Sequence, residues 1–252
     1  MSVDDYLDLE HQNLQRLRSM PHFREMIPLL DTLYTEAFEL IPTGSPPYYG
    51  RLLLVCHKSL LGAVSVMLRL HPEDAASVTR RCIEAASLAA AFKHDRANLE
   101  RWRSFEERTA RWDTRREGQR PKPFNPGIIY PTDERVERLR AQIGTLSDAY
   151  VHFTPEFMLN LDWRTVDAGG ENVSIHLNYF TKDHEQIERE MISLAGVHAT
   201  TLDIFDKCYD GHFRTNQRWA SLRALLEIRG AKLTLITNET DKPRTADHPP
   251  LP

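Results

Sequence analysis

Apolar residues recur every three to four positions along most of the chain, and this spacing predicts amphipathic helices. The spacing persists between breaks that contain proline or glycine. We expect helices at about 3–18, 22–41, 48–71, 73–94, 96–118, from Thr132 to the region before Pro155, 182–209 and 213–228. The sequence therefore predicts an all-α fold, a multi-helix bundle of seven or eight helices.

One segment, about 161–180, has a different period. Val173 and Ile175 belong to a run in which apolar and polar residues alternate, and Gly169–Gly170 upstream is typical of a turn. This pattern predicts one small inserted β-hairpin, which should pack against the helices because an isolated hairpin is only marginally stable. The segment 231–236 is predicted to be a short strand or an extended tail.

The domain organisation follows from the same pattern. The last predicted element ends before the polar segment that starts at about 241, so we expect a single helical domain over 1–240 that carries the hairpin. The remaining segment, 241–252, is polar and rich in proline, and we expect a C-terminal tail there.

Two helices show clearly which residues should be buried. On 73–94, Cys82 is predicted on the apolar face and Ser87 on the polar face, together with Arg80 and Glu84. On 182–209 one apolar stripe is expected in the core, formed by Ile187, Met191, Leu194, His198, Phe205 and Tyr209.

Composition and charge narrow the class of protein. Of 252 residues, 41% are hydrophobic and 27% charged, which suffices for a sizeable core. The net charge of −4 argues against sequence-blind nucleic-acid binding by the whole molecule. The acidic start, Met1–Glu10, does not resemble a secretory signal, and charged residues interrupt the apolar run 52–70. We therefore expect a cytoplasmic protein without a membrane span.

A basic patch lies at Lys93–Lys122, where ten Lys or Arg residues face six Asp or Glu residues. Trp102 and Trp112 lie in it, and basic residues with aromatic platforms are typical of single-stranded nucleic-acid sites. Both tryptophans share the apolar seam of the predicted helix, however, and the acids lie within a turn of the bases. A solvated, salt-bridged face is the better interpretation.

The three cysteines, Cys56, Cys82 and Cys208, are far apart and lack C-x-x-C spacing, so we expect neither a disulfide framework nor a zinc knuckle. Each lies in an apolar helical stretch, where cysteine usually serves as a small hydrophobe. Cys82 has no evident thiolate-stabilising neighbour beyond Arg81.

Two histidines, His57 and His198, lie on apolar helix faces. A buried imidazole can be a ligand, a base or a hydrogen-bonded core residue, and we favour the last interpretation. No Glu-x-x-His motif occurs, so no di-metal bundle site is expected. We predict no bound metal and no cofactor.

One constellation carries possible chemistry. Arg80 and Glu84 lie four residues apart on one helix face, and a later helix ends in Ser147-Asp148-Ala149-Tyr150-Val151-His152-Phe153. Over about residues 50–155 the chain resembles a group of bacterial helical proteins of unknown function related to the HEPN superfamily of nucleotide-binding, ribonuclease and abortive-infection proteins. In that group an R-x-x-x-E helix precedes a helix with a Ser-x-x-x-x-His ending.

The resemblance implies four candidate catalytic residues, Arg80, Glu84, Tyr150 and His152. HEPN ribonucleases carry an R-x-x-x-x-H motif, whereas the position five before His152 is Ser147 here. Our first hypothesis is therefore a non-catalytic helical interaction or small-ligand-binding protein, a homodimer of bacterial defence or stress response. The alternative is a metal-independent ribonuclease or another nucleotide-acting enzyme of HEPN-like type.

Overall fold

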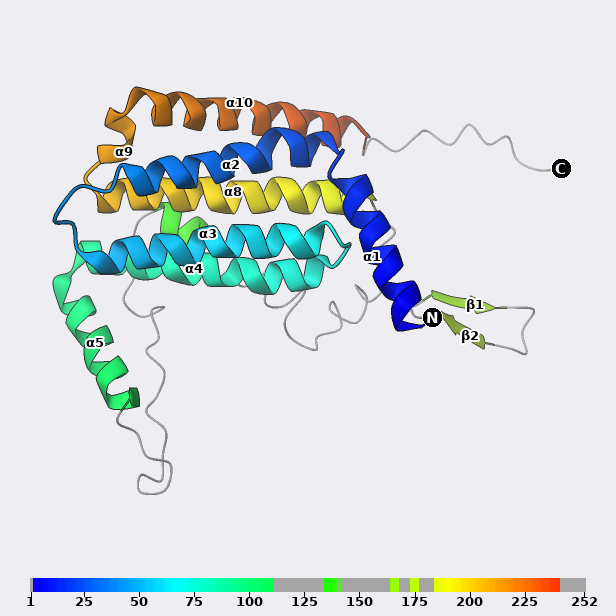
Figure 1. Cartoon of the computed structure of the whole chain (residues 1–252), viewed down its shortest axis with the longest axis horizontal. Coiled ribbons are helices and arrows are strands. Elements are labelled where there is room, and N and C mark those ends of the chain that lie inside the picture. Colours follow the sequence, from blue (N-terminus) through cyan, green and yellow to red (C-terminus); the bar gives the residue numbers. More distant parts are fainter. Residues whose placement is uncertain are drawn as a thin grey trace, which may run out of the picture.

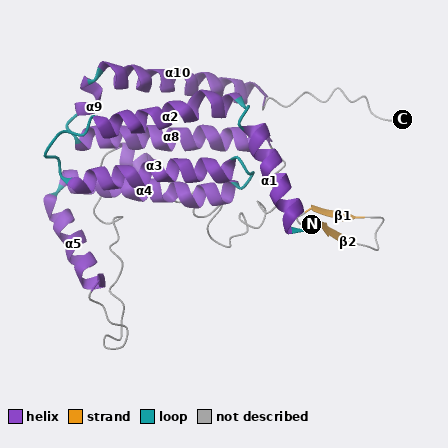
Figure 2. Cartoon of the chain, viewed as in Figure 1, coloured by secondary structure: helices purple, strands orange, loops and turns teal. Residues whose placement is uncertain are grey.

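Long helices dominate the computed structural model, which describes residues 2–110, 134–139, 141, 164–167, 173–176 and 184–240. The helices are α1 (Val3–Leu17), α2 (Pro21–Glu39), α3 (Pro47–Met67), α4 (Pro72–His94), α5 (Arg96–Ala110), α8 (His184–Cys208), α9 (His212–Thr215) and α10 (Gln217–Thr240). Residues 134–139 are also helical. Figure 2 shows how far helices outweigh every other element in this part of the chain. The predicted all-α class is confirmed.

Five long helices, α2, α3, α4, α8 and α10, lie side by side along the long axis of the molecule (Figure 1). Helix α8 takes the middle of this bundle, because it contacts α2, α3, α4 and α10. Helix α5 leaves the bundle at one end, and α1 crosses it at the other. Most of the predicted helix boundaries agree with the structure to within a few residues.

The core sits around α8, and the stripe predicted on that helix is confirmed. Its six members are between 0% and 6% exposed: Ile187, Met191, Leu194, His198, Phe205 and Tyr209. One prediction for α4 is wrong, because Ser87 was expected on the polar face and is fully buried. Ser87 is small, and a helix with neighbours on two sides can bury such a residue on the flank of its apolar face.

The turn between α3 and α4 has an unusual backbone. Leu70 has φ +68°, and the amide of the next residue, His71, donates to the carbonyl of Val66 at 3.1 Å. This six-residue closure is the Schellman motif, whose left-handed position is usually glycine. Leu70 is only 6% exposed, so burial of its side chain offsets a backbone cost of about 1–2 kcal/mol.

The prediction for 231–236 is wrong, because this segment belongs to α10. Three large residues spaced seven apart, Trp219, Leu226 and Leu233, are between 0% and 3% exposed. Helical periodicity therefore continues across the segment, and packing of Leu233 outweighs the strand preference of Thr234 and Ile236. The helix begins after Asn216, whose Oδ1 accepts from the Trp219 amide at 3.0 Å.

Two short strands occur within the region of the expected hairpin. β1 (Arg164–Asp167) and β2 (Val173–His176) pair antiparallel, with Arg164 opposite His176 and Asp167 opposite Val173. The predicted turn at Gly169–Gly170 lies outside the described residues. Packing of a hairpin against the helices stays a prediction.

Other predictions also fall outside the described residues. They concern 111–118 of the helix after α4, the tail 241–252, and the end of the helix that carries Tyr150 and His152. Of that last helix, the described residues Val136 and Leu139 are buried at 1%, as its apolar seam predicts.

By length and composition, α3 is the one helix in the described ranges that could cross a membrane. Core helices of bundles satisfy the same criteria. Leu53, Cys56 and Leu60 of α3 are fully buried in the bundle, where the helix contacts α2, α4 and α8.

Candidate functional site

The first candidate pair, Arg80 and Glu84, lies on the surface of α4. Arg80 Nε donates to Glu84 Oε1 at 3.0 Å, and the two side chains are 35% and 46% exposed. A solvated pair at this spacing stabilises a helix by about 0.3–0.5 kcal/mol. Tyr150 and His152 lie outside the described residues, so the structure shows only half of the predicted constellation.

The described part of the basic patch, from Lys93 to residue 110, contains paired charges. Lys93 Nζ lies 2.6 Å from Asp210 Oδ1, and Arg103 lies 3.2 Å from Glu100 Oε1. Trp102 packs on Phe92, with ring centroids 5.7 Å apart. These contacts fit a salt-bridged face better than a stacking platform for bases.

His57 is a hydrogen-bonded residue at the edge of the core. Its Nε2 lies 2.7 Å from Asp31 Oδ1, and its ring stacks on Tyr34 with centroids 5.1 Å apart. The side chain is 17% exposed. Its polar partner and its stacking partner both come from α2, so His57 ties α3 to α2.

A group of five fully buried polar or sulfur-bearing side chains lies at the centre of the bundle, and we call it the thiol–imidazole cluster. It comprises Tyr34, Cys56, Cys82, His198 and Thr201, each 0% exposed. Helices α2, α3, α4 and α8 each contribute at least one member. His198 Nδ1 lies 2.8 Å from the Tyr34 hydroxyl and 3.5 Å from Cys82 Sγ.

Cys82 has several polar neighbours within this cluster. Its Sγ lies 3.4 Å from Thr201 Oγ1, and the Cys56 thiol donates to the Cys82 carbonyl at 3.5 Å. The Cys56 thiol of α3 therefore contacts α4 at Cys82 inside the core.

The cluster sets the protonation of its members. Burial raises the pKa of the Tyr34 hydroxyl well above its ordinary value of 10.0. Tyr34 therefore keeps its proton, and its hydroxyl lies within hydrogen-bond distance of His198 Nδ1. His198 Nε2 is buried and has no hydrogen-bond partner among the described residues. Such an unsatisfied group costs about 1–3 kcal/mol.

The two thiols differ in acidity. Burial raises the pKa of the Cys82 thiol, but hydrogen bonds with Cys56, His198 and Thr201 outweigh burial and hold this pKa well below its ordinary value of 9.0. Burial raises the pKa of the Cys56 thiol, and its hydrogen bond to Cys82 adds to the rise. Cys82 is thus the more acidic of the two thiols.

The prediction that Cys82 lacks a thiolate-stabilising neighbour is wrong. Arg81, the neighbour in sequence, is exposed, and the stabilising groups come from α3 and α8. Periodicity placed Cys82 and His198 correctly on the apolar faces of their helices. It carried no information on which residues of different helices would meet.

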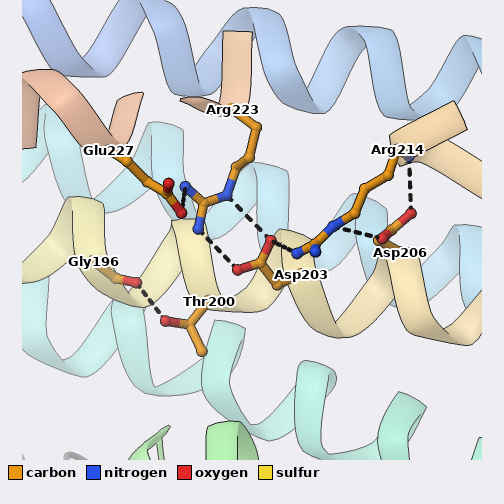
Figure 3. Close-up of polar contacts among 7 residues, drawn as sticks. All are labelled: Gly196, Thr200, Asp203, Asp206, Arg214, Arg223 and Glu227. Carbon is orange, nitrogen blue, oxygen red and sulfur yellow. Dashed lines mark hydrogen bonds and ion pairs between the residues drawn. The ribbon is translucent and has the colours of Figure 1, made fainter. Parts of the chain in front are cut away.

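A second set of polar residues escaped the sequence analysis, and we call it the α8–α10 ion network (Figure 3). Arg223 of α10 forms a two-pronged contact with Asp203 of α8, with Nη2–Oδ2 at 2.8 Å and Nε–Oδ1 at 3.2 Å. Arg214 of α9 reaches Asp203 at 3.0 Å and Asp206 at 3.0 Å. Glu227 lies 3.1 Å from Arg223 Nη1.

The α8–α10 ion network is structural in character. Asp203 and Arg223 are each 12% exposed, so removing one partner would take the two-pronged contact away from a nearly buried charge. The network joins α8, α9 and α10 and fixes how α10 lies on the bundle. Two aspartates flanking Phe205 on the buried stripe were the sequence signal for it.

No group of three or more His, Cys, Asp and Glu side chains in the described part of the chain is placed to hold a metal ion. The absence of a metal and of a cofactor stays a prediction for the whole protein.

Helix α10 has apolar residues on two faces. The inner face packs on α2 and α8, while an outer row spaced three and four residues apart is exposed: Ser221, Ala224, Ile228, Ala231 and Leu235. Ile228 is 66% exposed and Leu235 is 64% exposed. We call this row the α10 seam; it contains no charged residue over four helical turns.

A smaller exposed apolar group lies on α3, where Leu54, Val55 and Leu61 are 42%, 41% and 49% exposed. Arg51 and Lys58 lie exposed beside it, so this face mixes apolar and cationic side chains.

Comparison with known proteins gives no relative to guide the assignment. No protein-family model, no curated protein and no solved structure matches the chain.

Proposed function

We propose that this protein is a non-catalytic helical interaction module that works as a homodimer, joined by the α10 seams of two copies. The observation that carries the proposal is the uncharged, exposed row of Ser221, Ala224, Ile228, Ala231 and Leu235. Spacing of three and four residues is that of a helix–helix seam, which places its members on one side of the helix. A helix with apolar residues on two faces usually has neighbours on both.

The α10 seam is complementary to a second copy of itself when the two helices run antiparallel. With the two-fold axis between positions 229 and 230, Ile228 faces Ala231 of the partner subunit, and Leu235 faces Ala224 of the partner subunit. Each layer then pairs one large side chain with one small side chain, which keeps the packing even. A parallel pair would instead stack Ile228 on its own copy and leave the alanine layers loose.

The seam also has a rigid base. The α8–α10 ion network and the inner residues Trp219, Leu226 and Leu233 hold α10 on the bundle. A partner that binds the outer face therefore need not order the helix first, and this lowers the entropic cost of association. Because one helix pair is a small interface, we expect a dissociation constant on the order of micromolar.

The HEPN-like ribonuclease remains the alternative. It requires Arg80, Glu84, Tyr150 and His152 to meet in one pocket. Arg80 and Glu84 are partly solvated and pair with each other, which favours a surface ion pair over a catalytic group. The proposal has four further parts: a cytoplasmic location, a role in bacterial defence or stress, binding of a small ligand, and packing of the hairpin against the helices.

Sedimentation equilibrium over a concentration series tests the proposal. The wild type should be a dimer that dissociates on dilution, and Ile228→Asp should weaken it at least about a hundredfold, because each subunit would bury an unpaired carboxylate in an apolar layer of the seam. Leu61→Asp on α3 is the matched control and should leave the dimer unchanged. A wild type that is monomeric at every concentration, or an equal loss in both variants, would contradict the proposal.

A further inference from the structure

The thiol–imidazole cluster plays no part in the α10 seam, and its chemistry points to a separate property. We propose that Cys56 and Cys82 form a peroxide-oxidisable thiol pair, a modification site in which Cys82 reacts first and Cys56 resolves it to a disulfide. The co-reactant is a small hydroperoxide.

The first argument is that the two cysteines are adjacent. Cys56 Sγ lies 3.5 Å from the carbonyl oxygen of Cys82. The two cysteines come from neighbouring antiparallel helices, α3 and α4, which make the most extensive contact in the bundle. A disulfide needs Cβ atoms about 3.5–4.5 Å apart, a spacing that the backbones set and that closely packed helices can supply.

The second argument is the set of proton partners around Cys82. His198 Nδ1 at 3.5 Å can take the thiol proton, and Thr201 Oγ1 at 3.4 Å can donate to the thiolate. A purely structural cysteine in an apolar core needs no proton donor or acceptor beside it. The same cluster contains a second unusual feature, because His198 Nε2 is buried without a hydrogen-bond partner among the described residues.

The third cysteine offers a contrast within the same protein. Cys208 is also buried, at 4% exposed. Burial raises the pKa of its thiol to about 12, and neither a histidine nor a second cysteine contacts it in the described part of the chain. Burial alone therefore does not create the environment of Cys82.

The chemistry balances as follows. The proton of Cys82 passes to His198, and the thiolate attacks one peroxide oxygen. An S–O bond forms, the O–O bond breaks, and the leaving alkoxide or hydroxide takes a proton from His198 to give an alcohol or water. Cys82 is now a sulfenic acid. Cys56 attacks its sulfur, the S–S bond forms, the S–O bond breaks, and the departing hydroxide takes the Cys56 proton as water.

Peptide mapping of the full-length wild type tests the proposal directly. After brief treatment with hydrogen peroxide, alkylation and trypsin digestion, the peptides 52–58 and 82–93 should be recovered as one disulfide-linked species. The peptide 208–214, which holds Cys208, should remain alkylated at peroxide doses about tenfold higher. Absence of the linked species, or oxidation of Cys208 at the same rate, would overturn the proposal.

Variants separate the two roles. Cys56→Ser should stop the reaction at the Cys82 sulfenic acid, which a 1,3-dione probe captures by mass. Cys208→Ser should still form the linked species at the wild-type rate. Capture on Cys208 in place of Cys82 would contradict the assignment. If a core variant does not fold, the peptide map of the wild type alone tests the proposed thiol pair.

Discussion

Cys82 on α4 and His198 on α8 approach within 3.5 Å, Sγ to Nδ1, and both side chains are fully buried. Tyr34 of α2 reaches the same nitrogen at 2.8 Å. Side chains of α2, α4 and α8, which are distant in sequence, thus meet at His198 Nδ1 inside an apolar core. Buried polar groups must be satisfied by specific partners, so this point helps to fix how the helices sit against one another.

Removal of the Tyr34 hydroxyl tests that role. Tyr34→Phe should lower the free energy of unfolding by about 1–3 kcal/mol, because His198 Nδ1 loses its shortest hydrogen bond while it stays buried. Tyr209→Phe is the matched control, since the Tyr209 hydroxyl is buried without a partner among the described residues. That change should be neutral or stabilising. Equal losses in the two variants, measured by urea unfolding, would contradict the role of Tyr34.

The two kinds of ion pair should respond differently to truncation. Arg223→Ala should destabilise the protein by about 1.5–3 kcal/mol, because the nearly buried Asp203 would lose its two-pronged partner and keep only Arg214. Glu84→Ala should cost no more than about 0.5 kcal/mol, since its pair with Arg80 is partly solvated. Thermal and urea unfolding of the two variants give the comparison. A large loss at Glu84 would mean that this surface pair serves the fold.

A neighbouring pair on α10 distinguishes helix from strand in the segment 231–236. Leu233 is 2% exposed and Leu235 is 64% exposed, because a helix turns them to opposite sides. Leu233→Ala should cost about 2–5 kcal/mol and Leu235→Ala far less, measured at concentrations that keep the protein monomeric. A strand would place both on one face, so similar losses would contradict a helix here.

Stability should fall in alkaline solution. Burial raises the pKa of Cys208 from 9.0 to about 12 and that of Tyr209 from 10.0 to about 12. Folded protein keeps protons that the unfolded chain releases, so their contribution is fully present below pH 9 and is lost as pH rises toward 12. Each such proton changes the free energy of unfolding by about 1.4 kcal/mol per pH unit.

Urea unfolding between pH 8 and pH 12 measures this slope. Cys208→Ala should show a shallower decline than the wild type, whatever its stability at pH 8. A wild-type profile that stays flat from pH 9 upward would contradict the predicted shifts.

Sequence periodicity was enough to predict most of the helices, because the spacing of apolar residues within a segment shows which side of the helix is buried. It placed the α8 stripe, including His198, and the apolar face of α4. It failed at 231–236, which we predicted to be a short strand or an extended tail although Trp219, Leu226 and Leu233 repeat every seven residues. That repeat was visible in the sequence and identifies the correct helix.

Contacts between helices were beyond the reach of the same reasoning. Nothing local to Cys82 indicates that Cys56, His198 and Thr201 will surround it, because these residues lie on two other helices, α3 and α8. Asp203 and Asp206 were likewise a signal only in hindsight, as polar residues beside Phe205 on a buried stripe. Interhelical partners depend on how helices pack, which a single sequence without relatives does not specify.

Disulfide trapping across the α10 seam tests the central claim of a dimer most directly. Ile228→Cys and Ala231→Cys proteins are prepared separately, mixed, and oxidised under mild conditions, with the buried native cysteines left in place. The antiparallel seam predicts that the mixture forms more covalent dimer than either protein alone, because position 228 of one subunit faces position 231 of the other. Equal yields from mixed and unmixed samples, or no covalent dimer at all, would contradict it.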